Sequence, residues 1–166
     1  MKPYFTRLWA ALRGRDHELE GVRAFHQKFD LINRAVPGHL TQRKLAERFE
    51  CMMEELVEFS IAADNQNLVD QVDSLVDLVY FAKGTAVMLG IDWPTHWDHV
   101  QRANMAKVRG VTKRGHKVDV TKPEGWTPPE NDHRRTLRAT GYRRANWTWG
   151  GLRNGCIKED QCRDDR

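Results

Sequence analysis

Seven acidic side chains and no lysine or arginine lie between Cys51 and Ala82, although the whole chain carries a net charge of +4. At about 100° per residue, spacings of three and four place each of two acid groups on one side of a helix. Like charges at i,i+4 destabilise a helix by about 0.2–0.5 kcal/mol per pair, whereas converging carboxylates are the hard-oxygen ligands that Mg²⁺ prefers. The two groups are Glu54, Glu55 and Glu58, then Asp70, Asp73 and Asp77.

A solvated helix surface is the competing explanation for either group alone, because acidic faces are common on exposed helices. Asp70 has a second alternative. Asn67 is a candidate N-cap that would place Asp70 in the first turn of a helix, where the dipole favours an acid. Two such faces on neighbouring helices favour one shared site, with Asp70 ranked below Asp73 and Asp77.

Apolar residues at helical spacing predict an all-α fold, an antiparallel bundle of about four core helices. Thr41 is a candidate N-cap for the second helix, and Gly90 is the expected stop of the third. A short polar turn joins these two helices, so they should pack antiparallel and bring their acidic stripes face to face. The expected helices are 22–33, 41–63, 68–89 and 92–107.

The helical period ends after Gly110, and residues 111–130 contain two glycines and three prolines. That many helix breakers predict a loop, which we expect to close over the site. The expected organisation is an N-terminal extension over 1–20, a helical domain over 21–130 and a basic tail over 131–166.

Basic charge is concentrated in the C-terminal third. Residues 1–110 carry a net charge of −1, and residues 111–166 carry +5. Arginines interleaved with Trp147 and Trp149 are compatible with nucleic-acid binding through phosphate contacts and stacking. Because the segment lacks apolar periodicity, a solvated tail without regular structure is the favoured prediction. The arginines are Arg134, Arg135, Arg138, Arg143, Arg144 and Arg153.

Length and composition predict one ordinary domain, since the chain has 166 residues of which 40% are apolar. No apolar run approaches the roughly 18–20 residues of a membrane span, and no cleavable signal is visible at the N-terminus. Three cysteines make an odd count, which argues against a disulfide framework. We therefore expect a cytoplasmic protein without a membrane partner.

Four motifs in order resemble the all-α nucleoside triphosphate pyrophosphohydrolases, the superfamily of MazG and phosphoribosyl-ATP pyrophosphohydrolase, in its small phage and bacterial form. The resemblance covers about 22–130, and the ordered set is more specific than any single motif. The motifs are Glu54-Glu55-x-x-Glu58, Asp73-x-x-x-Asp77-Leu-Val-Tyr, Asn104-Met-Ala-Lys107 and Lys122-Pro-Glu-Gly-Trp126.

The resemblance implies Mg²⁺-dependent cleavage of a nucleoside triphosphate between its α and β phosphates, with Mn²⁺ as the alternative ion, by a homodimer or homotetramer. Its metal ligands map onto Glu55, Glu58, Asp73 and Asp77, with Glu54 beside the metal or positioning the attacking water. Glu54, Glu55 and Glu58 form the catalytic motif. The second motif departs from the usual Glu-x-x-Asp, because Ser74 stands three residues before Asp77. A damaged or modified nucleotide is the alternative substrate, as in house-cleaning hydrolases.

Substrate contacts are expected from polar, cationic and aromatic residues that follow the acids in the chain, and from one histidine on the first expected helix. Each has a structural alternative: a lysine at a helix C-terminus is favoured by the dipole, a tryptophan can pin a loop, and a lone histidine on an amphipathic helix is more often structural. A non-catalytic helical binding protein with a nucleic-acid-binding tail is the alternative function. The expected substrate residues are Asn104, Lys107, Arg114, Lys122, Trp126 and His26.

Overall fold

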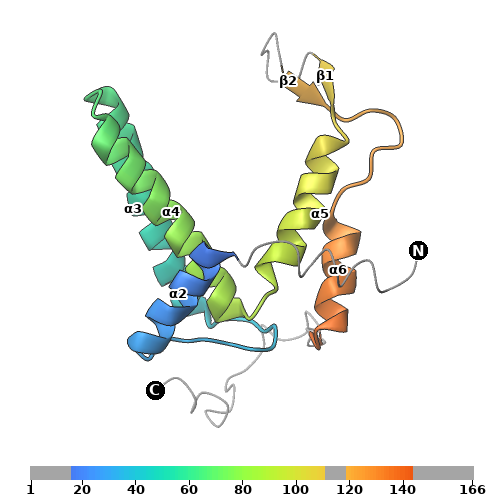
Figure 1. The fold of residues 1–166 in the computed structure, drawn as a ribbon, viewed down its shortest axis with the longest axis horizontal. Coiled ribbons are helices and arrows are strands. Elements are labelled where there is room, and N and C mark those ends of the chain that lie inside the picture. The colour runs from blue at the N-terminus through green and yellow to red at the C-terminus, as the bar shows by residue number, and fades with distance from the viewer. Residues whose placement is uncertain (1–15, 111–118, 144–166) are drawn as a thin grey trace, which may run out of the picture.

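The molecule is V-shaped and almost entirely helical. Its computed structural model describes residues 16–110 and 119–143, which form five α-helices and one two-stranded ribbon. Figure 1 shows two arms joined by the turn between α4 and α5, with α2 against the lower part of α4. The five helices confirm the all-α prediction. One arm is α3 and α4, and the other is α5 and α6. The helices are α2 (His17–Lys28), α3 (Gln42–Asp64), α4 (Leu68–Leu89), α5 (Trp93–Met105) and α6 (Glu130–Ala139).

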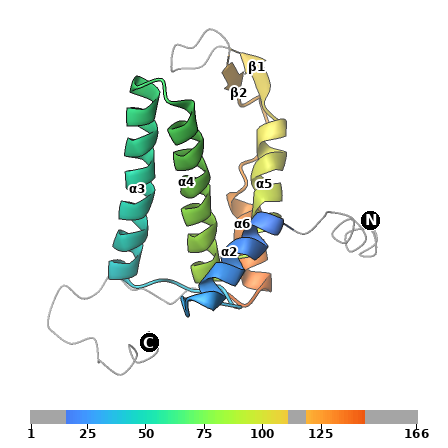
Figure 2. The ribbon, with the colours of Figure 1, turned by 60° about the vertical axis from the view of Figure 1, so that its left-hand side comes forward.

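The α3–α4 hairpin begins and ends where its capping residues predicted. The Thr41 hydroxyl accepts a hydrogen bond from the Lys44 backbone N–H at 3.2 Å, and the Asn67 side chain accepts from the N–H of Val69 at 3.1 Å. Each cap satisfies a backbone donor that the first turn of its helix leaves unpaired. Figure 2 shows the two helices side by side along their length, so the expected antiparallel packing is confirmed.

Gly90 ends α4 in the left-handed conformation, with φ 68°. A Cβ atom at this position would lie 2.4 Å from the backbone oxygen of Val36. Only glycine avoids both the steric penalty of positive φ and this collision. The turn after α4 is therefore fixed by one residue, and it sets the direction in which the second arm leaves.

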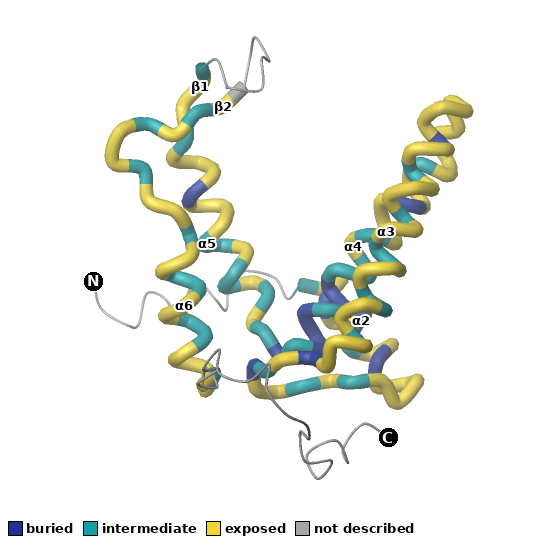
Figure 3. Tube along the Cα trace, turned by 180° about the vertical axis from the view of Figure 1, so that it is seen from behind, coloured by how far each residue is buried: buried dark blue, intermediate teal, exposed yellow. Residues whose placement is uncertain are grey.

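A small core holds α2 against α4 where the arms meet. Leu19, Val22 and Val87 are buried, with Tyr80 and Trp93 packed against them. Figure 3 shows buried residues gathered near this junction, while the outer parts of both arms are mostly exposed. The junction is thus the best-packed part of the described chain.

A buried lysine adds an ionic contact to this junction. The Lys83 side chain is 8% exposed, and its ammonium donates to Asp16 at 2.9 Å and to Glu18 at 2.5 Å. Asp16 also caps α2 by accepting from the Leu19 N–H. This cap explains why the first helix starts at His17, before the expected range of 22–33. The helix ends at Lys28, because Phe29 is its C-cap and Asp30 adopts a positive φ of 52°. Residue 20, the expected end of an N-terminal extension, lies inside α2.

The second arm contains two elements that the sequence did not predict. The expected loop over 111–130 is wrong for 119–121, because β1 (Val108–Gly110) pairs antiparallel with β2 (Asp119–Thr121). The irregular tail is wrong for the first part of 131–166, where α6 packs on α5. Three-residue strands are too short to show a period.

Polar contacts attach α6 to α5, which explains why apolar periodicity gave no signal there. His96 Nδ1 lies 2.7 Å from His133 Nδ1, and His99 Nε2 lies 2.8 Å from the Thr136 hydroxyl. Arg102 forms an ion pair with Asp132. These pairs satisfy polar groups on both helices without an apolar stripe on α6.

Within 16–110 and 119–143, no individual helix has the length and apolar character to cross a membrane, and only α4 and α5 taken as a pair bent by 119° would pass on length and composition.

Candidate active site

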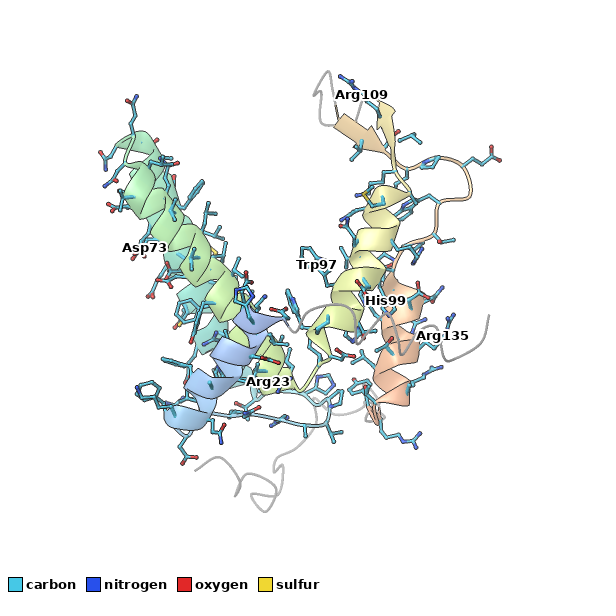
Figure 4. The ribbon with its side chains drawn as sticks, in the orientation of Figure 1. Arg23, Asp73, Trp97, His99, Arg109 and Arg135 are labelled. Atoms are coloured by element: carbon cyan, nitrogen blue, oxygen red, sulfur yellow. The ribbon has the colours of Figure 1, made fainter. Side chains whose placement is uncertain are left out.

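Glu55 and four other carboxylates of the hairpin, Glu58, Asp77, Asp73 and Glu54, form a group that is called the acid cluster below. Burial raises the pKa of the Glu55 carboxyl, and the negative charges of Glu58, Asp77, Asp73 and Glu54 raise it further. Because α3 pairs with α4 along the hairpin, the charges of both aspartates of α4 reach Glu55 on α3. Figure 4 shows Asp73 about halfway along the hairpin.

Asp73, not the residue three before Asp77, is the second acid of α4 that reaches this cluster. Ser74 is 3% exposed and its hydroxyl donates to the backbone oxygen of Asp70 at 2.9 Å, so that position belongs to the packed face of the helix. Asp70 accepts a 2.6 Å hydrogen bond from the side chain of its N-cap, Asn67. Asp70 therefore lies in the first turn of α4 beside its N-cap, which is the structural role that the sequence offered as the alternative to a metal ligand.

The donor set suits a hard divalent cation. None of the five carboxylates has an ion-pair partner within 16–110 and 119–143, so no cation of these residues offsets their repulsion. The same residues include no three side chains placed closely enough to ligate one ion. A group of carboxylates in which the pKa of Glu55 is raised provides the hard oxygen ligands that suit Mg²⁺. To bind one ion, these side chains would have to move closer together.

Two glutamates of the acid cluster adjoin an uncovered apolar surface. An open groove on α3 is lined by Phe49, Met53 and Val57 together with Glu54 and Glu58. Phe49 is 61% exposed and Val57 is 51% exposed. The acid cluster thus lies beside a surface that a monomer leaves in contact with water.

Four of the expected substrate residues come together at the outer end of the second arm. The ribbon pairs Val108 with Thr121, which places the adjacent Lys107 and Lys122 beside each other. The Lys107 ammonium donates to Asn104 at 2.8 Å, and the Lys122 ammonium lies 4.4 Å from the centre of the Trp126 ring. This group of Asn104, Lys107, Lys122 and Trp126 is called the cation cluster below.

Trp126 also attaches the cation cluster to α5. Its indole N–H donates to the backbone oxygen of Ala103 at 2.7 Å. The predicted loop-pinning role is therefore present, and the ring face also meets Lys122. Arg114, the remaining expected cation, lies outside the described residues.

His26 lies away from both groups, at the junction of the arms. It is 3% exposed, and its Nδ1 lies 2.8 Å from the backbone oxygen of Ile32. A methyl group on Gly84 would lie 3.1 Å from His26 Nε2 and 3.2 Å from Arg48 Nη2. The structure thus packs His26 between α2 and α4.

Arg48 is a charged residue of the hairpin that the sequence analysis did not single out. Its guanidinium donates to the Thr85 hydroxyl at 3.0 Å and to the Phe81 backbone oxygen at 2.7 Å. Burial lowers its pKa. Seven residues are about two helical turns, so Arg48 and Glu55 lie on the same side of α3. This spacing in the sequence could have identified Arg48.

The acid cluster and the cation cluster of one chain lie on different arms. Asp73 lies on the hairpin, whereas Arg109, next to the cation cluster, lies at the outer end of the other arm (Figure 4). The side of α5 that carries Trp97 is turned toward the hairpin, and Trp97 is 57% exposed. One chain therefore presents both chemistries without joining them.

No curated protein matches the sequence. A family model described as phosphoribosyl-ATP pyrophosphohydrolase matches residues 22–104, half of the chain. The matched segment includes the whole acid cluster and ends at Asn104, before Lys107. The family match and the antiparallel helices that bring its acids together show that this chain belongs to the phosphoribosyl-ATP pyrophosphohydrolase family, a MazG-like family of all-α nucleoside triphosphate pyrophosphohydrolases.

Proposed function

We propose that this protein is a Mg²⁺-dependent nucleoside triphosphate pyrophosphohydrolase. The net reaction adds one water across the anhydride between the α and β phosphates, and it yields a nucleoside monophosphate and pyrophosphate. Membership of the family implies pyrophosphohydrolase activity of this general type. The observation that carries the proposal is the convergence of four other carboxylates on Glu55 with no cation paired to any of them among the described residues.

The acid cluster would hold the metal through Glu55, Glu58, Asp73 and Asp77. When bound, Mg²⁺ neutralises charge on the phosphoryl oxygens and so favours attack by water. Glu54 is the exposed neighbour of these ligands, and its carboxylate can accept a hydrogen bond from the attacking water and orient it in line with the leaving pyrophosphate. The raised pKa of Glu55 makes protons compete with the metal for this site.

The cation cluster would hold the substrate's phosphates. Lys107 and Lys122 are adjacent, and an ammonium group serves as a point charge for phosphate oxygens. Asn104 holds the Lys107 ammonium from the last turn of α5. Trp126 presents an aromatic face next to these charges, where a nucleoside base could stack.

We propose that a second copy of the chain brings its cation cluster to the acid cluster of the first. Both clusters lie on separate arms of one chain, and the hairpin exposes large apolar side chains that a stable monomer would not leave uncovered. A homodimer is the smallest assembly that covers this surface and completes the site. The hairpin side chains that are more than half exposed are Phe49, Val57, Ile61, Leu68, Val69, Val72 and Val76.

Pyrophosphate release tests the reaction. Wild-type protein is incubated with a panel of ribo- and deoxyribonucleoside triphosphates in Mg²⁺ or EDTA, and Glu58→Gln serves as the inactive variant. We expect pyrophosphate and the matching monophosphate only with metal and only from the wild type. Release of inorganic phosphate instead, or full activity of Glu58→Gln, would contradict the proposal.

Mixing two inactive variants tests the shared site. Glu58→Gln lacks an acid, and Lys107→Gln lacks a cation, so neither variant alone builds a complete site. After mixing and subunit exchange, a dimer with sites made from both copies should recover about a quarter of the wild-type rate. If the mixture stays inactive although the subunits exchange, each chain completes its own site.

A further inference from the structure

The outer face of α6 carries a basic groove that plays no part in the proposed hydrolysis. The groove has a volume of about 560 Å³ and includes Arg134, Arg138 and Arg143 among its lining residues. Leu137, Tyr142 and His133 also line it, and Glu130, the first residue of α6, is its acidic residue. Its position on the second arm separates it from the acid cluster (Figure 1).

Docking of α6 on α5 determines which of its side chains face outward. His133 and Thr136 contact α5, and Asp132 pairs with Arg102 of that helix. Arg134 and Arg138 are four residues apart, so they lie on one stripe about 6 Å apart along the axis. Arg135, the next arginine of α6, points away from the hairpin arm in Figure 4. Both arginines that α6 contributes to the groove, Arg134 and Arg138, are exposed.

The turn after α6 adds the third arginine to the groove. Gly141 adopts φ 97°, and the Tyr142 N–H donates to the Leu137 backbone oxygen at 2.9 Å. The Tyr142 hydroxyl lies 2.8 Å from His39 Nε2 in the connection between α2 and α3. The chain is thereby folded back at Tyr142, which brings Arg143 to the same groove as Arg138.

The guanidinium groups of Arg134, Arg138 and Arg143 form no ion pair with an acid of the described residues. Arg135 is paired with Asp132, and Arg102 is paired with the same carboxylate. Within 16–110 and 119–143, Arg138 and Arg143 have no ion-pair partner, and Arg134 donates only to Asn131 at 3.0 Å. A planar guanidinium with free donors is well suited to bind phosphate oxygens.

We propose that this groove binds the phosphate backbone of a nucleic acid. A site for a single nucleotide would enclose most of the ligand with apolar side chains and a few placed polar groups. Here the donors are exposed and spaced along an open groove, which suits a ligand with repeated phosphates whose binding gains from counterion release. The inference does not depend on the hydrolytic activity.

The test is the salt dependence of oligonucleotide binding by the full chain. Fluorescence anisotropy of a labelled 30-nucleotide single strand is measured in EDTA, so that no divalent ion can bridge the strand to the acid cluster. Three phosphate contacts contribute about −2 to the slope of log affinity against log salt for a single strand. Arg138→Gln should make the slope shallower by about 0.7, and Arg134→Gln with Arg138→Gln by about 1.4.

Two further variants separate a groove from general positive charge. Arg43→Gln removes the same charge from α3, where the side chain is 90% exposed, and it should leave the slope unchanged. Glu130→Gln removes the acid of the groove, so it should tighten binding.

Three results would overturn the proposal. They are no binding by the wild type at low salt, the same slope change for Arg43→Gln as for Arg138→Gln, and displacement of the strand by an equimolar amount of pyrophosphate, which would indicate a site for small anions.

Discussion

At the scale of single residues, Glu55 is the acid of the cluster whose pKa is raised by its neighbours. Its carboxyl is half-buried and faces four other carboxylates, and burial together with their charges raises its pKa. A folded-state pKa above the unfolded value means that the native state binds the proton more tightly. Ionised Glu55 therefore opposes folding above the usual glutamate range, and a bound cation would remove that cost.

Glu58→Gln should make the metal-free protein more stable while it abolishes hydrolysis. The change removes the i,i+4 repulsion between Glu58 and Glu54, about 0.2–0.5 kcal/mol. It also removes the charge that has the largest electrostatic effect on Glu55. The pKa of Glu55, followed by NMR, should fall toward its ordinary value, and the melting temperature in EDTA should rise. Glu50→Gln is the control for the pKa, because it also removes an i,i+4 repulsion with Glu54 but is not among the charges that raise the pKa of Glu55, which should therefore stay as in the wild type. An unchanged Glu55 pKa in Glu58→Gln would show that these side chains do not interact.

Two glycines show how the same substitution has opposite effects in different positions. Gly90→Ala forces a side chain into positive φ and against the Val36 backbone oxygen at 2.4 Å, so the loss should be at least about 1–2 kcal/mol. Gly21→Ala lies within α2 with no atom inside 4 Å of the added Cβ, and it should gain about 0.5–1 kcal/mol. Denaturant unfolding of the two variants and the wild type measures these changes in the free energy of unfolding. Equal effects would mean that the turn after α4 does not adopt the described conformation.

At the scale of elements, the α5–α6 contact includes a histidine pair of which at least one ring must stay neutral. Burial, then the charges of His133 and His99, lowers the pKa of His96. Burial and His99 lower the pKa of His133, against the opposing effect of Glu130 and Asp132. The His96–His133 hydrogen bond needs one unprotonated Nδ1, so it is lost when both rings are cations. His96 Nε2 makes no hydrogen bond within the described residues.

Stability should fall as the pH is lowered from 7 to 5. Because the folded pKa values lie below the ordinary 6.5, the unfolded state binds more protons at acid pH, and stability present above 6.5 is lost as the pH falls below it. Melting temperatures of the wild type and His133→Gln across this range measure the effect, and the variant should have the flatter profile. His17→Gln, an exposed position on α2, should keep the wild-type slope. Identical profiles for all three proteins would exclude this origin.

At the scale of the whole molecule, the V shape leaves the hairpin without a partner along most of its length. The described core is confined to the junction of the arms, where α2 meets α4. Val69 is 77% exposed and Val76 is 58% exposed on α4. Uncovered side chains of this size on both helices favour association with another copy.

Association should make thermal stability depend on protein concentration, because a ligand or subunit that binds only the folded state stabilises it by mass action. Val76→Lys should shift the protein to monomers in light scattering and remove the concentration dependence. Leu31→Lys, in the connection between α2 and α3 where the residue is 44% exposed, is the control. A wild-type protein that is monomeric at all concentrations would contradict both the dimer and the shared site.

Most of the helical framework and the first half of the candidate site followed from the sequence by itself. Periodicity and caps at Thr41, Asn67 and Gly90 predicted the hairpin nearly to the residue, because a helix is specified by local interactions within about one turn. The same local geometry placed the acids on facing stripes. The sequence therefore determined the helices, their antiparallel packing and the helix that carries each acid group.

Only the tertiary structure decided what lies around that pair. The ribbon that joins Lys107 to Lys122 and the docking of α6 through His96 and His133 depend on contacts distant in sequence, which leave no period in a local window. The burial of His26 also required the packing of α2 on α4. The sequence marked Gly90 as the end of α4 but not the direction in which α5 leaves, because that turn packs against the distant Val36 backbone and this contact has no local signal.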